Sequence, residues 1–242
     1  MEEIKTQAIV LKSSDYKEGG KLLTLFSVDY GLITAKIKGV TKPKSKLAFA
    51  AQPLCFGEYI LVEKYGYTVI NCTSIESFYS LSKDFDKFIS ASGMLEIVSV
   101  IVKEQEPNAI LFVELLKALK MLEYSNAVPL AVFIKFFIDS LNVAGYKLGL
   151  DKCLFCGDNN SQKYKFSFSH GGLACAGCGD ANSISLSQGE VAVLKNINMT
   201  EMEDLEKLRF IGVENLCSVV KVLNKYFSDK TGEVLKAVKD YI

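Results

Sequence analysis

The first 80 residues carry the short apolar runs and turn signals that are typical of β-strands. Turns such as Glu18-Gly19-Gly20 and Lys64-Tyr65-Gly66 separate segments that are rich in β-branched and aromatic residues. The expected strands are Lys5–Ser13, Lys21–Val28, Leu32–Val40, Gln52–Glu63 and Tyr67–Ser74. Five short strands predict a small closed barrel. The OB-fold is the leading candidate, and an SH3-like barrel fits the pattern nearly as well.

From about Leu81 the apolar residues recur at steps of three and four, which is the spacing of helices. Pro107 and Pro129 stand where new helices would begin, and Ser187 with Glu190 has the spacing of a capping box. Residues 151–183 interrupt this pattern with many Gly, Asn and Ser residues. We therefore expect an α+β protein, with an N-terminal OB-fold domain at 1–80 and an α-helical domain at 81–242 that contains an insert at 151–183.

Four of the seven cysteines form two close pairs inside this insert. Cys153-x-x-Cys156 is followed after 18 residues by Cys175-x-x-Cys178, a spacing that predicts a tetrahedral zinc site. Gly157 and Gly179 follow the two pairs and would permit tight turns. Four thiolates leave no open position on the metal, so the zinc would be structural. Sulfur ligation alone leaves an iron–sulfur cluster open. The other cysteines, Cys55, Cys72 and Cys217, read as packing residues, and His170 as an ordinary loop residue.

Lysine clustering is the main charge signal, because the net charge is zero and Arg209 is the only arginine. Five lysines fall close together with no acidic residue between them: Lys36, Lys38, Lys42, Lys44 and Lys46. Beside a barrel strand, such lysines suit the phosphates of a nucleic acid. Four nearby aromatic residues are candidates for base stacking: Phe26, Tyr30, Tyr65 and Tyr67. A solvated basic loop without a partner has the same sequence signature.

Several classes of protein are not indicated by the sequence. It contains no phosphate-binding loop and no nucleophile motif, and its single histidine disfavours histidine-based relays. We therefore expect no enzyme. No apolar run is long enough for a membrane span, and the first residues lack the features of a signal peptide. A cytoplasmic protein without membrane association is expected.

Several segments together resemble the RecO family of bacterial DNA-repair proteins. Residues Ala8–Glu18 and Lys21–Phe26, followed by Gly31, are similar to the start of the family. Residues Lys38–Leu47 resemble its basic segment after the third strand. Cys153, Cys156, Cys175 and Cys178 stand at the family's position within a helical domain. The resemblance covers essentially the whole chain in order.

This resemblance implies an OB-fold followed by a helical domain with a zinc knuckle, and a recombination mediator that binds single-stranded DNA and anneals complementary strands. The implied partners are RecR and the acidic C-terminal tail of single-strand binding protein, with assisted loading of RecA in the RecF pathway as the outcome. Many of the family's basic positions are arginine where this chain has lysine, so more salt-sensitive DNA binding is expected. We expect the site for the acidic tail near Lys117, Lys120 and Lys135.

Two other functional classes share these signals. A zinc-ribbon RNA-binding or translation-associated factor would prefer structured RNA to single-stranded DNA. A protein adaptor with inert lysines would bind no nucleic acid even at low salt. A zinc hydrolase is disfavoured because it would need an open metal position.

Overall fold

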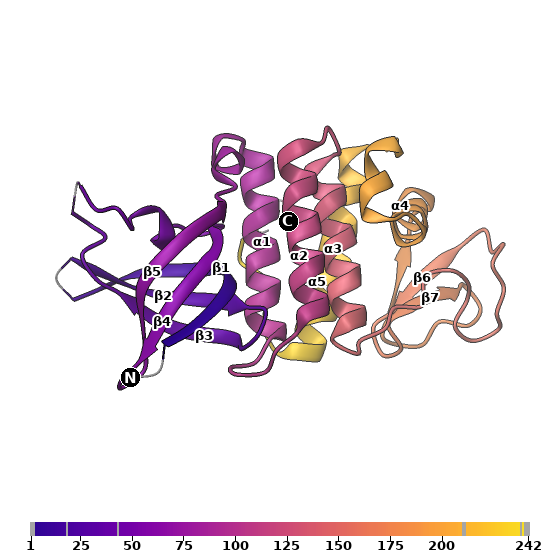
Figure 1. Cartoon of the computed structure of the whole chain (residues 1–242). Coiled ribbons are helices and arrows are strands. Elements are labelled where there is room, and N and C mark those ends of the chain that lie inside the picture. The colour runs from indigo at the N-terminus through magenta and orange to yellow at the C-terminus, as the bar shows by residue number, and fades with distance from the viewer. Residues whose placement is uncertain (1–2, 18, 43, 210–211, 238, 240–242) are drawn as a thin grey trace.

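The computed structural model describes residues 3–17, 19–42, 44–209, 212–237 and 239. Figure 1 shows a β-barrel, a bundle of helices and a small sheet in a row. In the described part of the chain, no helix has both the length and the apolar character that crossing a membrane would require.

The N-terminal body is a closed five-stranded barrel with the strand order β1-β2-β3-β5-β4. All neighbouring strands are antiparallel except β3 and β5, which are parallel. This is the OB-like architecture that the sequence predicts. The strands are β1 (Glu3–Tyr16), β2 (Gly20–Ser27), β3 (Gly31–Ile37), β4 (Phe56–Glu63) and β5 (Tyr67–Glu76).

Several strand ends differ from the sequence expectation, and the first strand extends to Tyr16 instead of ending at Ser13. The third strand ends at Ile37 instead of Val40, and the fourth begins at Phe56 instead of Gln52. A short 3-10 turn, Phe49–Ala51, precedes the fourth strand, and the buried hydroxyl of Tyr59 donates a hydrogen bond of 3.0 Å to the carbonyl of Ala50. This side-chain bond holds the turn against the barrel, a long-range interaction that local strand propensity does not register.

The C-terminal body contains helices α1 to α5, of which α3 is the most buried. Local signals begin several of them: Asp84 caps α1, Asn108 caps α2, and α3 begins at Pro129. The predicted capping box of α4 is present, with Ser187 and Glu190 bonded to each other's backbone N–H. The bounds are Phe85–Ile101, Ala109–Tyr124, Pro129–Val143, Gln188–Met199 and Val213–Thr231, with 3-10 segments at Tyr79–Lys83 and Met202–Lys207.

The insert between α3 and α4 forms a three-stranded antiparallel sheet in the order β7-β6-β8. Its strands are β6 (Tyr164–Ser167), β7 (Gly172–Cys175) and β8 (Ser183–Leu186). The ring of Phe166 is fully buried and contacts Tyr226 of α5 at 5.8 Å between centroids. The sheet is therefore anchored to the helices on one side, while its loops extend away from them (Figure 1).

One hydrophobic core runs from the barrel into the helices. The ring of Phe112 on α2 lies 5.2 Å from that of Phe26 on β2 and 6.0 Å from that of Phe56 on β4. Ile9 and Leu11 of β1 belong to the same core as the helices, whereas Ala8 and Val10 face the barrel interior. Alternate residues of β1 thus serve two different cores.

Candidate metal centre and nucleic-acid interface

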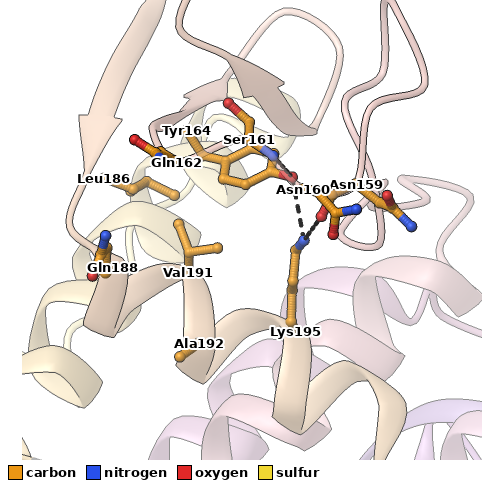
Figure 2. Close-up of a pocket in the computed structure, with 10 residues that line it drawn as sticks. All are labelled: Asn159, Asn160, Ser161, Gln162, Tyr164, Leu186, Gln188, Val191, Ala192 and Lys195. Atoms are coloured by element: carbon orange, nitrogen blue, oxygen red, sulfur yellow. Dashed lines mark hydrogen bonds between the residues drawn. The ribbon is translucent and has the colours of Figure 1, made fainter.

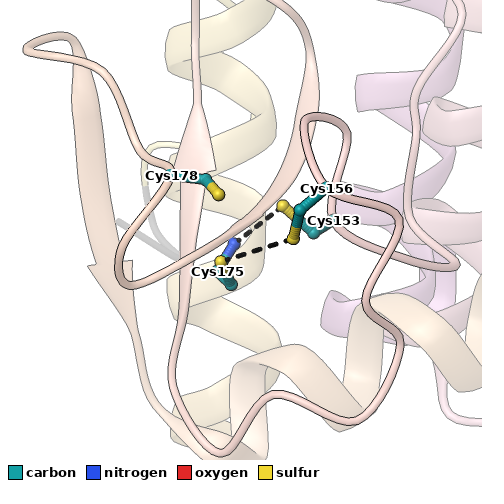
Figure 3. A group of neighbouring side chains, drawn as sticks. All are labelled: Cys153, Cys156, Cys175 and Cys178. Atoms are coloured by element: carbon teal, nitrogen blue, oxygen red, sulfur yellow. Dashed lines mark hydrogen bonds between the residues drawn. The ribbon is translucent and has the colours of Figure 1, made fainter.

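Two loops of the insert bring the four paired cysteines together, as Figure 3 shows. Cys153 and Cys156 lie on the turn before β6, whereas Cys175 ends β7 and Cys178 lies in the turn after it. Their sulfur atoms all lie within 4.8 Å of one another. Residues 19 or more positions apart in the chain therefore converge on one point, and the group can hold a metal ion.

The geometry of the sulfur atoms fits a tetrahedral ion. Zinc–thiolate bonds of about 2.3 Å place neighbouring sulfur atoms about 3.8 Å apart, and the Sγ atoms of Cys156 and Cys175 are 3.7 Å apart. Gly157 has φ +76°, so the first predicted glycine turn is present. Gly179 is not in the left-handed region. A Cβ atom there would instead lie 2.7 Å from the Lys165 side chain.

Backbone amides favour the thiolate form of Cys153, whereas hydrogen bonds with neighbouring thiols, led by that of Cys175, raise the pKa of Cys178 to about 12. The amide of Cys175 donates to the sulfur of Cys153 at 3.2 Å. Burial raises the pKa of Cys153, but the backbone N–H groups of Cys156, Cys175 and Phe155 together lower it to about 6. A low thiol pKa prepares the ligand for a metal, because the thiolate is the form that binds.

His170 lies near the cysteines but is not one of the convergent group. Its Nδ1 atom is 3.3 Å from a carboxylate oxygen of Asp180 and 3.2 Å from the hydroxyl of Ser167. Its ring meets the ring of Phe155 edge to face at 4.9 Å. Hydrogen bonds led by that from Ser183 lower the pKa of Asp180 to about 2. His170 thus holds the insert's loops together as an ordinary structural residue.

The five clustered lysines lie along and beyond the third barrel strand. Lys36 is half-buried on β3, and the other four are exposed: Lys38, Lys42, Lys44 and Lys46. In the part of the chain that the structure describes, none of the five lies within ion-pair distance of a carboxylate. Among the described residues, no carboxylate pairs with their charges.

The aromatic residues near these lysines have different environments. Phe26 is fully buried against Phe112, so the expectation that it stacks on bases is wrong. Tyr30 and Tyr67 are half-buried against the barrel core, whereas Tyr65 is 91% exposed at the turn between β4 and β5. Sequence reasoning missed Tyr16, the half-buried last residue of β1. Its ring lies 5.6 Å from the ammonium nitrogen of Lys36.

A shallow pocket of about 290 Å³ lies beside two of the lysines expected near the acidic-tail site. Lys117 and Lys120 flank it, and the apolar parts of Met121, Tyr124 and Met202 form much of its lining, together with Ser125 and Glu203. Lys135 is not part of this surface. It is buried on α3, with its ammonium 3.1 Å from the Asp139 carboxylate, so the expectation that it helps to bind a tail is wrong.

A second hollow, of about 270 Å³, lies between the insert and α4 (Figure 2). Amide side chains and hydroxyls dominate its upper wall, and Lys195 reaches it from α4. The Lys195 ammonium donates to the carbonyl of Asn159 at 3.2 Å and to the hydroxyl of Tyr164 at 3.4 Å. One lysine held by neutral oxygens offers far less attraction to a polyanion than the clustered lysines of the barrel.

Comparison with known proteins covers both bodies of the chain. Residues 1–78 match the family model described as "Recombination protein O N terminal", and residues 82–238 match "Recombination protein O C terminal". The chain is 31% identical to "DNA repair protein RecO" of Acetivibrio thermocellus, over 95% of this chain and 92% of that protein. It is also 31% identical to that of Thermoanaerobacter sp. (strain X514), over 100% and 98%. The chain belongs to the RecO family of DNA-repair proteins.

Proposed function

We propose that this protein is a non-catalytic recombination mediator that binds single-stranded DNA through the barrel. The observation that carries the proposal is a group of lysines along β3 and the segment after it that have no ion-pair partner among the described residues: Lys36, Lys38, Lys42, Lys44 and Lys46. Lysines that have no carboxylate partner are free to replace the counterions of a phosphate backbone. Two strands held with reduced repulsion can pair, and no nucleotide hydrolysis is needed for that step.

The four cysteines are proposed to hold a structural zinc ion, which would fix the two loops of the insert to each other. The ion supplies four metal–sulfur bonds when it is bound. The chain itself supplies the convergent thiolates and the amide donors around Cys153. In this proposal the zinc has no part in DNA chemistry, because four protein ligands leave it no open position.

The pocket beside Lys117 and Lys120 is proposed as the site for the acidic tail of single-strand binding protein. Two lysines next to an apolar surface suit a peptide with acidic residues and an apolar end. Recruitment through that tail would bring the lysines of the barrel to coated DNA. Together with RecR, this would assist RecA loading in the cytoplasm.

The decisive experiment is binding of the full-length, metal-loaded protein to a labelled oligo-dT across a salt series. Five phosphate contacts predict a log–log salt slope of roughly −3.5, at about 0.7 for each contact on a single strand. Replacing all five clustered lysines by Glu should abolish binding. The matched control replaces five exposed lysines that have no ion pair in the described structure: Lys83, Lys147, Lys152, Lys221 and Lys236.

Each outcome separates the competing functions. Salt-dependent binding that only the barrel variant loses supports the proposal. Stronger binding of the parent protein to a structured RNA than to oligo-dT would favour the RNA-binding factor. No binding to either nucleic acid at low salt would favour the adaptor. Equal losses in the two variants would mean that the site is not on the barrel.

A further inference from the structure

Two lysine side chains converge on one tyrosine ring at the edge of the barrel's lysine-rich face. The ammonium nitrogens of Lys17 and Lys36 lie 5.5 and 5.6 Å from the ring centre of Tyr16. Lys17 immediately follows Tyr16, whereas Lys36 comes from β3, two strands away. This convergence joins the end of β1 to the strand on which the clustered lysines begin.

Strand register explains how residues from β1 and β3 meet. Tyr16 pairs with Gly20, and Lys36 pairs with Leu22 on the same strand β2. Gly20 and Leu22 are two residues apart, so they share one face of the sheet. Because Gly20 has no side chain, nothing from that position stands between the tyrosine ring and the lysine.

Neither lysine has an ion-pair partner in the described part of the chain. Asp15 is the described acidic residue nearest to Lys17 in the sequence. Its carboxylate forms an ion pair with Lys21, at 3.2 Å from the ammonium nitrogen. The attraction of an exposed lysine to an aromatic ring is weak, so both ammonium groups can move to a stronger anion. The tyrosine ring then becomes available to a planar partner.

We propose that Tyr16 stacks on one unstacked nucleobase of a single strand while Lys17 and Lys36 bind the phosphates on either side of it. The inference rests on the proposed function, since it deepens the DNA-binding role of the same barrel face. Stacking of a base on Tyr16 would also make the lysine-rich face of the barrel bind single strands in preference to duplexes. A base can reach the ring only when it has left the stack of a duplex.

Two tyrosines that are more exposed than Tyr16 lack this combination. Tyr65 is more exposed, but no lysine ammonium is described over its ring. Tyr79 is 67% exposed and has the ammonium of Lys83 at 5.5 Å, yet it lies in the 3-10 segment before α1, away from the clustered lysines. Tyr79 is therefore a matched control, because it is an exposed tyrosine with one lysine outside the proposed site.

The test compares the full-length, metal-loaded parent with Tyr16→Leu, Tyr16→Phe and Tyr79→Leu. The probes are a labelled oligo-dT and a strand of equal length made of abasic sites. Tyr16→Leu should weaken binding to oligo-dT about tenfold, within the range for loss of one base stack. Binding to the abasic strand and the salt slope should stay at parent values. Tyr16→Phe and Tyr79→Leu should bind oligo-dT within about twofold of the parent, because stacking needs only a ring.

The contrary results are distinct from failure of the proposed function. If the five-lysine variant loses binding but Tyr16→Leu binds oligo-dT as the parent does, the base contact is wrong and the DNA-binding function stands. Equal losses on oligo-dT and the abasic strand would show that Tyr16 only supports the fold. If Tyr16→Leu fails to fold, the parent protein alone tests the inference. Equal affinity of the parent for oligo-dT and for the abasic strand would overturn the base contact.

Discussion

Lys135 and Asp139 form an ion pair on α3, with the ammonium nitrogen 3.1 Å from the carboxylate oxygen; the lysine is buried and the aspartate is half-buried. Burial raises the pKa of Asp139, while the charge of Lys135 and its hydrogen bond lower it in part. The lysine therefore offsets part of the cost of burying this carboxylate. Lys135 therefore contributes to the stability of the helices, although its position in the sequence suggested that it was part of a basic surface.

Replacing Lys135 by Met should leave the half-buried Asp139 without its ammonium partner and lower the free energy of unfolding by about 1–3 kcal/mol at pH 7. Urea unfolding measures this change. Lys117→Met is the control, because the Lys117–Glu114 pair on α2 is exposed and should contribute no more than about 1 kcal/mol. A loss in Lys135→Met no larger than in the control would contradict this account of the ion pair.

The same variant should show a defined pH dependence. Loss of the lysine removes an influence that lowers the pKa of Asp139, so the folded-state pKa of this carboxyl should rise further above its unfolded value. The folded protein then binds the extra proton at acid pH, and the penalty shrinks as the pH falls from 7 towards 5. A penalty for Lys135→Met, relative to the parent, that grows towards pH 5 would have the wrong sign.

Tyr16 shows why sequence reasoning found the lysines but missed the ring beside them. In regular strand alternation, Tyr16 would share a face with Ala8 and Val10, which point into the barrel. The register of β1 against β2 shifts between Val10 and Lys12, so Leu11 is an extra residue and the parity changes after it. A bulge of this kind leaves no clear mark in the sequence, and the outward direction of Tyr16 could not be read from it.

At the scale of elements, the signals with a fixed spacing along the chain were the dependable ones. The capping box of Ser187 and Glu190 and the convergence of the two cysteine pairs both follow from fixed spacings in the chain. The start of β4 did not follow, because the turn before it depends on a bond from Tyr59, nine residues from Ala50. Spacing therefore predicted the capping box and the cysteine ligand set, whose residue types recur at fixed intervals, but not a turn that depends on one tertiary hydrogen bond.

Metal removal should therefore act on the insert and spare the rest of the molecule. Cys178→Ser should lower the bound zinc, measured by elemental analysis, and speed amide hydrogen exchange in β6, β7 and β8. Exchange in α1 and α3 should be unchanged, because these helices pack mainly against other helices and not against the strands of the insert. Cys217→Ser is the control, since this half-buried thiol on α5 lies outside the cysteine cluster. A parent protein without zinc after metal-replete purification would contradict the structural site.

At the scale of the whole molecule, the change from alternating to helical periodicity near residue 80 could be read from the sequence, but the joint between the two bodies could not. Phe112 carries much of that joint through its contacts with Phe26 and Phe56, which come from different strands. In the sequence, each of the three is simply an apolar residue of its own strand or helix. Nothing in the neighbouring sequence indicates whether its side chain packs inside the barrel or against the helices. The shared core fixes the lysine face relative to the pocket of α2.

Phe112→Ala should consequently destabilise the barrel and the helices together. Truncating a buried phenylalanine costs about 3–5 kcal/mol, and hydrogen exchange should accelerate by similar factors in β1 and in α1 if they unfold as one unit. Val113→Ala, the exposed neighbour on α2, should change the unfolding free energy by no more than about 0.5 kcal/mol. If exchange in β1 stayed at the parent rate while α1 accelerated, the barrel would be an independent unit. Its lysines could then change their orientation relative to the helices, and the acidic tail and the DNA strand would bind to parts that move separately.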